Sequence, residues 1–191
     1  MDILKFAIGD EDEKNIANIR NILQQKGHLI ACEERDGPSL LRKIRSISPD
    51  FVIVGYNIPG MKGLEIARIV EGDKIAPTLI IADSSQDIFL REMGNESFVH
   101  IIKPISQMQL LGTIDFVYNN FKRLINLEKE VSELKNMLET RKAVEKAKGI
   151  IMDKYDMKEK DAFRYMQKRS MDECKPVFDI AKRIIEKSKN K

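Results

Sequence analysis

The chain has 191 residues, of which 42% are hydrophobic and 33% are charged. A chain of this length buries one ordinary hydrophobic core, and the remainder is too short for a second large one, so we expect one domain with a helical appendage. The two cysteines, Cys32 and Cys174, lack metal or redox spacing, which argues against a disulfide framework. No leader-like segment opens the chain and no apolar run approaches bilayer length, so we expect a cytoplasmic protein that does not bind membranes.

Positive charge is concentrated near the end of the chain. Residues 141–191 contain 16 Lys and Arg against 9 Asp and Glu, whereas the formal net charge of the whole chain is only +3. A basic end is typical of polyanion binders, although lysine-rich helix faces are more often ordinary solvated surface. Motifs must therefore decide between these two interpretations.

Short apolar runs alternate with segments of helical periodicity in the first half of the chain. The runs, rich in Val, Ile and Phe, span residues 4–8, 29–32, 51–54, 78–82 and 98–102. Between them, apolar residues recur at helical spacing: Ile16, Ile19 and Leu23; Leu40, Leu41 and Ile44; Leu64, Ala67 and Ile69; Ile88, Phe89 and Met93. The alternation predicts an α/β fold over residues 1–120, a doubly wound five-stranded parallel sheet with helices on both faces.

The ends of the predicted strands carry polar residues in a fixed order. Asp10 and Glu11 follow the first strand, an Asn-x-Pro-Gly-Met-x-Gly loop (57–63) follows the third, and Lys103-Pro104 follows the fifth. On these residues the first half of the chain resembles the receiver domain of bacterial two-component response regulators. The resemblance implies a flavodoxin-like fold in which the acidic pair holds Mg²⁺, the lysine neutralises a phosphoryl group, and the Lys-Pro peptide bond is cis.

Three positions depart from the receiver pattern. Gly55 stands where the family has the aspartate that accepts the phosphoryl group, Ala82 replaces the usual Thr or Ser, and His100 replaces the usual aromatic residue. Glycine has no carboxylate to attack phosphorus or to complete the oxygen shell of a metal ion, so phosphorylation at this position is chemically impossible. We interpret residues 1–120 as a pseudo-receiver domain.

Two interpretations of the remaining pocket, formed by Asp10, Glu11, Ala82 and Lys103, stay open. In the first, the charges only compensate one another at a polar edge of the sheet. In the second, the pocket binds a small anion at Lys103, or weakly binds Mg²⁺ at Asp10 and Glu11. The sequence predicts no catalytic residue, no other cofactor and no further metal site.

Apolar residues follow a heptad pattern after the predicted sheet domain. They are Val117, Leu124, Val131 and Leu138 at a positions and Leu127 and Leu134 at d positions. The pattern predicts a coiled-coil linker helix over 117–141. In a parallel homodimer, Arg123 would face Glu128 of the partner subunit, and Glu130 would face Lys135 of the partner subunit. The alternative is an amphipathic helix that packs within its own chain.

The last segment, residues 138–191, can be parsed into three helices. The first ends near residue 155, and the other two span about 158–169 and 174–187. Ser170 and Asp172 are candidate N-caps for the third helix. Gly149 lies inside the first, where glycine costs about 1 kcal/mol relative to alanine, and we interpret it as a site of close helix packing.

The same segment carries a signature spread over about 50 residues. It comprises Ala147-Lys148-Gly149-Ile150-Ile151-Met152, Tyr155, Ala162-Phe163, Ser170-Met171, Ala181 and Ile184-Ile185. On these residues the segment closely resembles the ANTAR domain, the RNA-binding output module of bacterial antitermination regulators. The resemblance implies a three-helix bundle that works as a dimer, binds paired hairpins in nascent messenger leaders and blocks formation of a terminator.

Basic residues would contact RNA phosphates, and an aromatic residue would stack on bases of the hairpin loops. The candidate RNA-binding residues are Arg141, Lys142, Lys146, Lys148, Tyr155, Lys168, Arg169, Ser170 and Lys175. For two of them a structural role competes with RNA contact, namely core packing for Tyr155 and helix capping for Ser170.

The sequence therefore predicts a homodimeric, RNA-binding antitermination regulator. The main alternative is a protein-interaction module, in which the pseudo-receiver docks a signalling partner and the C-terminal helices only dimerise. DNA binding is disfavoured because no helix-turn-helix with a basic recognition helix is present. An enzyme is disfavoured because no nucleophile with a base, metal set or phosphate loop appears.

Overall fold

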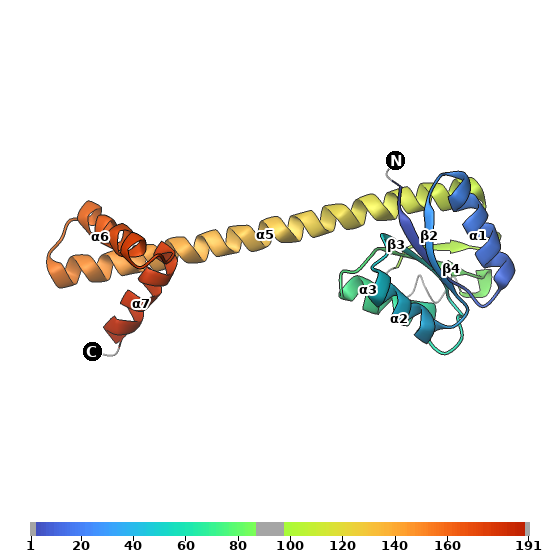
Figure 1. The fold of residues 1–191 in the computed structure, drawn as a ribbon, viewed down its shortest axis with the longest axis horizontal. Helices are drawn as coiled ribbons and strands as arrows, with labels where there is room; N and C mark the ends of the chain where they lie inside the picture. Colours follow the sequence, from blue (N-terminus) through green and yellow to red (C-terminus); the bar gives the residue numbers. More distant parts are fainter. Residues whose placement is uncertain (1–2, 87–97, 190–191) are drawn as a thin grey trace. The chain divides into compact units, whose positions relative to one another are not determined.

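The computed structural model describes residues 3–86 and 98–189. The chain divides into two compact units, Met1–Leu124 and Ile125–Lys191, which we call the sheet unit and the helical unit. Helix α5 (Gln107–Tyr155) contributes residues to both (Figure 1). The helix predicted around Ile88, Phe89 and Met93 lies outside the described residues.

The sheet unit is built on five parallel strands in the order β2-β1-β3-β4-β5. The strands are β1 (Lys5–Gly9), β2 (Leu29–Glu34), β3 (Phe51–Gly55), β4 (Thr78–Ala82) and β5 (His100–Ile102). Each coincides with one of the predicted apolar runs, although β5 begins two residues later than expected. The predicted doubly wound, receiver-like fold is confirmed.

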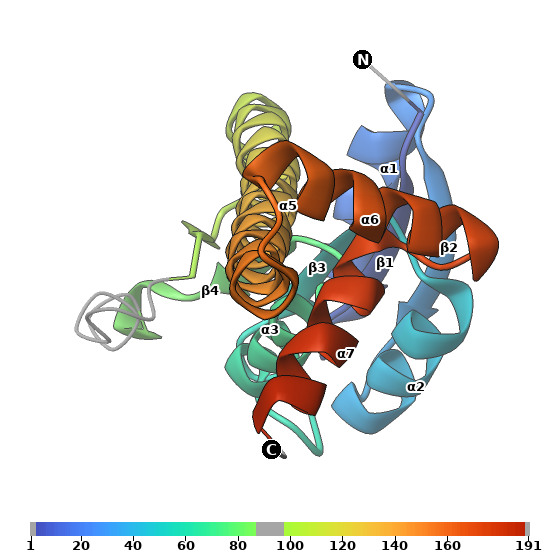
Figure 2. The same ribbon diagram turned by 90° about the vertical axis from the view of Figure 1, so that its left-hand side faces the viewer.

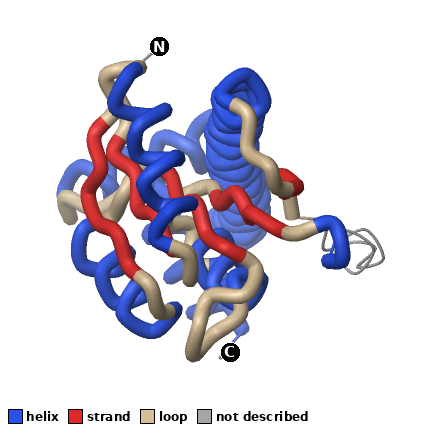
Figure 3. The backbone as a smooth tube through the Cα atoms, turned by 90° about the vertical axis from the view of Figure 1, so that its right-hand side faces the viewer, coloured by secondary structure: helices blue, strands red, loops and turns tan. Residues whose placement is uncertain are grey.

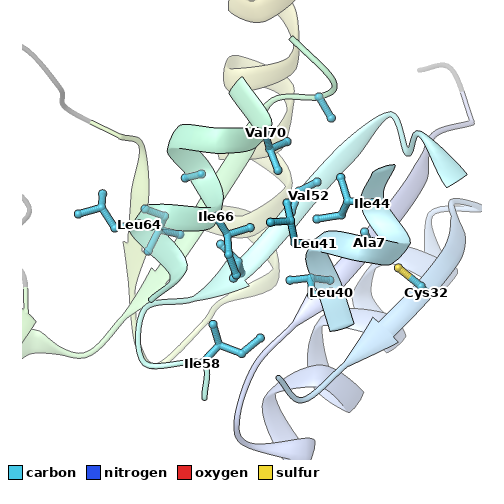
Figure 4. Packing of buried hydrophobic residues seen from close by; sticks show 14 of the residues in the cluster. Ala7, Cys32, Leu40, Leu41, Ile44, Val52, Ile58, Leu64, Ile66 and Val70 are labelled. Carbon is cyan, nitrogen blue, oxygen red and sulfur yellow. The ribbon is translucent and has the colours of Figure 1, made fainter. Parts of the chain in front are cut away.

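Both faces of the sheet are covered by helices (Figure 3). Side chains alternate along each strand, so that Phe6, Ile8 and Phe51 face one layer while Ala7 and Val52 face the other. The first layer contains α1 (Glu13–Gln25) and the beginning of α5, and the second contains α2 (Gly37–Ile47) and α3 (Gly63–Gly72). Figure 4 shows how apolar side chains of α2 and α3 fill the second layer against the strands.

The loop after β3 is held tightly against the end of that strand. The backbone N–H of Gly63, the first residue of α3, donates to the carbonyl of Tyr56 at 3.0 Å. A Cβ atom at position 63 would lie 2.3 Å from the carbonyl oxygen of Gly55, a contact that only glycine avoids. The glycine-containing loop therefore fixes the start of α3 beside the predicted pocket.

The helical unit packs α6 (Glu159–Asp172) and α7 (Val177–Lys189) beside the last turns of α5 (Figure 1, Figure 2). Its small core consists of Ala147, Ile151, Ala162, Met166, Ile180 and Ala181. The predicted N-caps are wrong, because α6 extends to Asp172 and includes Ser170 and Asp172 in its last turn. Helix α7 instead begins after Pro176, whose carbonyl accepts from the backbone N–H groups of Asp179 and Ile180.

The middle of α5 presents apolar side chains that no other described part of the chain covers. Leu124, Leu127, Val131, Leu134 and Leu138 are between 46% and 63% exposed. These residues therefore do not belong to a hydrophobic core of the described chain. An amphipathic helix packed within its own chain, the alternative to a coiled coil, would have buried them. Val117, by contrast, is 7% exposed and packs in the core of the sheet unit, so its assignment to the heptad seam is wrong.

None of the described helices is long and apolar enough to span a membrane.

On α3, Glu71 accepts a hydrogen bond from the backbone N–H of Thr78 at 3.0 Å, and its burial raises the pKa of the carboxyl group above the ordinary value.

We expect replacement of Glu71 by Gln to change how stability depends on pH. In the folded wild type, Glu71 keeps its proton to a higher pH than in the unfolded chain, so its contribution falls as pH rises from the ordinary pKa of 4.5 through the raised folded pKa. Gln keeps the hydrogen-bond acceptor but does not titrate. Urea unfolding at pH 4 and pH 7 should show the variant gaining stability relative to wild type at the higher pH.

Glu65→Gln is the matched control for that comparison, since Glu65 lies on the exposed side of the same helix. If the unfolding free energies of wild type and Glu71→Gln differ by the same amount at both pH values, burial does not raise the pKa of Glu71 in the folded protein.

Candidate nucleic-acid interface

In the receiver-like pocket at the carboxyl ends of the strands, the charged side chains compensate one another. Asp10 is 1% exposed, and its Oδ1 accepts from the backbone N–H of Asp12 at 2.9 Å and from the Asn15 amide at 3.2 Å. Its Oδ2 faces the ammonium group of Lys103, 3.8 Å away, and that ammonium also lies 3.9 Å from a carboxylate oxygen of Asp83. Lys103 thus serves as counter-ion to two carboxylates.

The side chain of Asp10 fills the space that a residue larger than glycine would need at position 55. A Cβ atom built on Gly55 would lie 2.7 Å from Asp10 Oδ2 and 3.0 Å from its Cγ. The hollow between Asp10, Glu11, Gly55 and Lys103 leaves no room for a water-sized molecule. Ala82 is buried at the end of β4 and brings no polar group to this edge.

The donor set at this edge does not fit a Mg²⁺ ion. One oxygen of Asp10 already accepts two hydrogen bonds, and the other faces a cation. Gly55 supplies no carboxylate, and no group of three metal-ligating side chains occurs among the described residues. The Lys103–Pro104 peptide bond is cis, as the receiver resemblance implies.

Five of the candidate RNA-binding residues are exposed on the helical unit. They are Arg141, Lys142 and Lys146 on α5, Lys168 on α6, and Lys175 in the turn before α7. Their side chains make no hydrogen bond or ion pair with another residue of the described segments. These cations are open to a polyanion.

Lys148 is placed differently from the other lysines. It is 8% exposed, and its ammonium lies 2.7 Å from Glu145 Oε1 and 2.6 Å from Glu159 Oε1. The hydrogen bonds that Lys148 donates to Glu145 and Glu159 raise the pKa of Lys148, and the bond that Glu159 accepts lowers the pKa of its carboxyl group. The ion pair ties α5 to the first turn of α6, so this charge is compensated within the bundle.

Arg169 and Ser170 are engaged at the turn between α6 and α7. Glu173 accepts from Arg183 and, at 2.8 Å, from Arg169, and these hydrogen bonds lower the pKa of its carboxyl group. The hydroxyl of Ser170 donates to the backbone carbonyl of Lys175. Both candidates therefore have structural partners in the folded bundle.

Tyr155 lies beside a groove formed by all three helices of the unit. Its side chain is 48% exposed, its ring centroid lies 6.1 Å from that of Tyr165, and the Lys154 ammonium lies 5.2 Å from the ring centre. The groove encloses about 480 Å³ and is lined by Ile150, Ile151, Asp153, Lys154, Tyr155, Tyr165, Arg169, Ile184, Lys187 and Ser188. We refer to it as the tyrosine groove.

Sequence reasoning missed most of this groove. Lys154 is adjacent to Tyr155 in the chain, and that adjacency was an available signal. Tyr165 and Lys187 come from two other helices, so only the packing of the bundle reveals that they share a surface.

Comparison with known proteins gives two matches along the chain. Residues 6–115 match the response regulator receiver domain, and residues 132–185 match the ANTAR domain. The chain belongs to the ANTAR-containing response regulators. This is a family of RNA-binding antitermination regulators and not a family of enzymes.

Individual relatives agree with this assignment. The transcriptional regulatory protein PdtaR of Mycobacterium tuberculosis is 32% identical over 178 residues, covering 92% of this chain and 87% of the relative. The chemotaxis protein CheY of Pseudomonas aeruginosa is 26% identical over 119 residues, covering 60% of this chain and 96% of the relative.

Solved structures resemble the fold of the sheet unit. The receiver domain of the response regulator NarL from Mycobacterium tuberculosis aligns with a TM-score of 0.56 at 17% identity, covering 62% of this chain and 98% of that one. CheY in a CheX–CheY complex from Borrelia burgdorferi aligns with a TM-score of 0.54 at 20% identity, covering 60% and 88%. Both support the receiver fold.

The interpretation of Gly149 as a close-packing site is wrong for the described chain, because a Cβ atom there would meet nothing within 4 Å. We therefore expect Gly149→Ala to raise the unfolding free energy of the helical unit by about 1 kcal/mol, since alanine is the better helix former. Chemical denaturation followed by circular dichroism would measure the change.

Gly63→Ala is the contrasting control and should destabilise the sheet unit, because its Cβ would meet a backbone oxygen at 2.3 Å. A loss of stability in Gly149→Ala would contradict the open environment.

Proposed function

We propose that this protein is a dimeric antitermination regulator that binds paired hairpins in nascent messenger leaders in the cytoplasm, and that it does so without phosphorylation at position 55. The observation that carries the proposal is the set of exposed, uncompensated cations on the ANTAR-matched helices, which also carry an exposed tyrosine. Lys148, Arg169 and Arg183, by contrast, already pair with Glu159 and Glu173.

Electrostatics supports RNA as the partner. Arg141, Lys142 and Lys146 follow one another along α5, and Lys168 and Lys175 add charge from α6 and the following turn. Cations of this kind bind phosphates and release condensed counter-ions, which makes the affinity depend steeply on salt. The exposed ring of Tyr155 offers a face on which a loop base can stack.

The exposed apolar seam of α5 supports dimerisation. Five Leu and Val side chains recur at heptad spacing from Leu124 to Leu138, and monomeric proteins rarely leave such a stripe uncovered. The flanking charges suit a parallel pair, since Arg123 would face Glu128 of the partner subunit. Two bundles held together in this way would engage two hairpins of one leader.

Loss of the phosphoacceptor supports control by something other than phosphoryl transfer. Gly55 offers no nucleophile, and the Asp10 carboxylate is compensated by Lys103. We propose that Asp10, Glu11, Ala82 and Lys103 form a vestigial pocket with a structural role.

The test compares full-length wild type with a variant in which Lys142, Lys146 and Lys168 are changed to Gln. Binding of a synthetic two-hairpin RNA is measured by fluorescence anisotropy between 50 and 300 mM salt, concentrations spanning roughly the range over which counter-ion release is visible. We expect weaker binding, and a slope of log K against log salt that is shallower by about 2 for each protomer, because each lost phosphate contact removes about 0.7 to 0.9.

The matched control changes Lys5, Lys14 and Lys26 of the sheet unit to Gln, which removes the same charge from exposed positions outside the ANTAR match. The control should bind like wild type, and unrelated duplex DNA should not compete. Unchanged RNA binding by the first variant would contradict the proposed interface, and absence of RNA binding by wild type would favour a partner-docking module instead.

A further inference from the structure

One residue of the tyrosine groove is unexplained by phosphate binding. Asp153 lines the groove together with Lys154, Arg169 and Lys187. Across residues 3–86 and 98–189 it forms no ion pair or hydrogen bond with any of these cations. Its carboxylate is exposed and has no partner among the described residues, in a groove whose other charged lining residues are basic.

This position is unfavourable for a carboxylate in two ways. Asp153 lies two residues before the end of α5, where the negative end of the helix dipole disfavours an anion. A carboxylate in the groove also repels the phosphates that its lysine neighbours attract. An acid at this place therefore weakens both the helix end and non-specific binding of a polyanion.

The walls of the groove suit a flat, aromatic ligand. Tyr155 and Tyr165 supply aromatic rings, Ile150 and Ile184 supply apolar side chains, and the enclosed volume is about 480 Å³. This volume lies within the usual range of small-ligand pockets, roughly 300 to 1,000 Å³. One unpaired nucleobase with its sugar is a ligand of this size and shape, and Lys154 and Lys187 of the groove suit its phosphates.

We propose that the tyrosine groove binds one unpaired guanine of a hairpin loop and that Asp153 recognises it. An ionised carboxylate only accepts hydrogen bonds. The Watson–Crick edge of guanine places two donors side by side, N1–H and the N2 amino group, and these match the two oxygens of a carboxylate. Adenine and cytosine each offer one amino donor beside an acceptor, and uracil offers one N–H between two carbonyl acceptors, so their edges fit less well.

This inference rests on the proposed RNA-binding function and adds a base-specific contact to it. Phosphate contacts set the overall affinity, whereas Asp153 discriminates among bases. The same carboxylate that weakens binding of RNA in general would strengthen binding of RNA that carries guanine at the right place.

The experiment measures binding of full-length protein to two synthetic two-hairpin RNAs that differ only in their loops. One has guanosine and uridine in the loops, and the other has inosine in place of every loop guanosine, which removes the N2 amino group. Wild type should bind the guanosine RNA at least fivefold more tightly than the inosine RNA. Asp153→Asn should reduce this preference to less than twofold, while its affinity for the inosine RNA rises because a negative charge is gone.

Asp172→Asn is the matched control, since Asp172 is also an exposed aspartate in the last turn of a helix of the same unit but lies outside the groove. It should keep the wild-type preference. Circular dichroism should confirm that both variants fold.

Three results would overturn the inference. If Asp153→Asn binds both RNAs more tightly by the same factor, Asp153 acts only through its charge. If wild type binds both RNAs equally well, the groove does not read the N2 amino group, although the proposed RNA-binding function stands. If wild type binds neither RNA, the proposed function fails and this inference fails with it.

Discussion

Both hydrophobic cores and the proposed dimer depend on the apolar side chains of helix α5. Leu110, Ile114 and Val117 complete the core of the sheet unit, and Ala147 and Ile151 complete the core of the helical unit. Between them, the heptad residues from Leu124 to Leu138 stay exposed on a single chain. Exposed leucine and valine at this spacing cost free energy in water, and a second copy of the helix is the partner that would bury them.

Charge compensation separates structural ions from those available for function. Asp10 with Lys103, Lys148 with Glu159, and Glu173 with its two arginines hold elements in place. A side chain whose charge is compensated in such a pair is less available to bind a ligand. Among the described residues of the ANTAR-matched helices, what remains is a group of exposed lysines with Arg141 and Arg164, together with the tyrosine groove.

Much of the fold could be predicted from the sequence, because buried strands and amphipathic helices impose their periods on the chain. The departures have physical causes. Val117 follows the heptad pattern, but a pattern does not reveal that the sheet buries this residue first. The end of α6 was missed because Ser170 and Asp172 are common caps, yet the helix includes both residues and ends at Asp172, next to Glu173, which pairs with Arg169.

The candidate site was less predictable than the fold. The uneven distribution of charge along the sequence identified the basic segment. Its lysines could be proposed as phosphate contacts without knowledge of how the helices pack. Whether a given cation is open or paired depends on neighbours far along the chain, as Lys148 and Glu159 illustrate. The tyrosine groove brings together side chains from three helices, so no local pattern contains it.

The most direct test of the account is the mass of the assembly in solution, measured by light scattering with and without a two-hairpin RNA. Wild type should have twice the 22.0 kDa mass of one chain and should bind one RNA per dimer. Replacement of Leu127 and Leu134 by Asp should yield a folded monomer that binds a single hairpin but no longer engages both. A monomeric wild type, or a dimer that survives these replacements, would contradict the account.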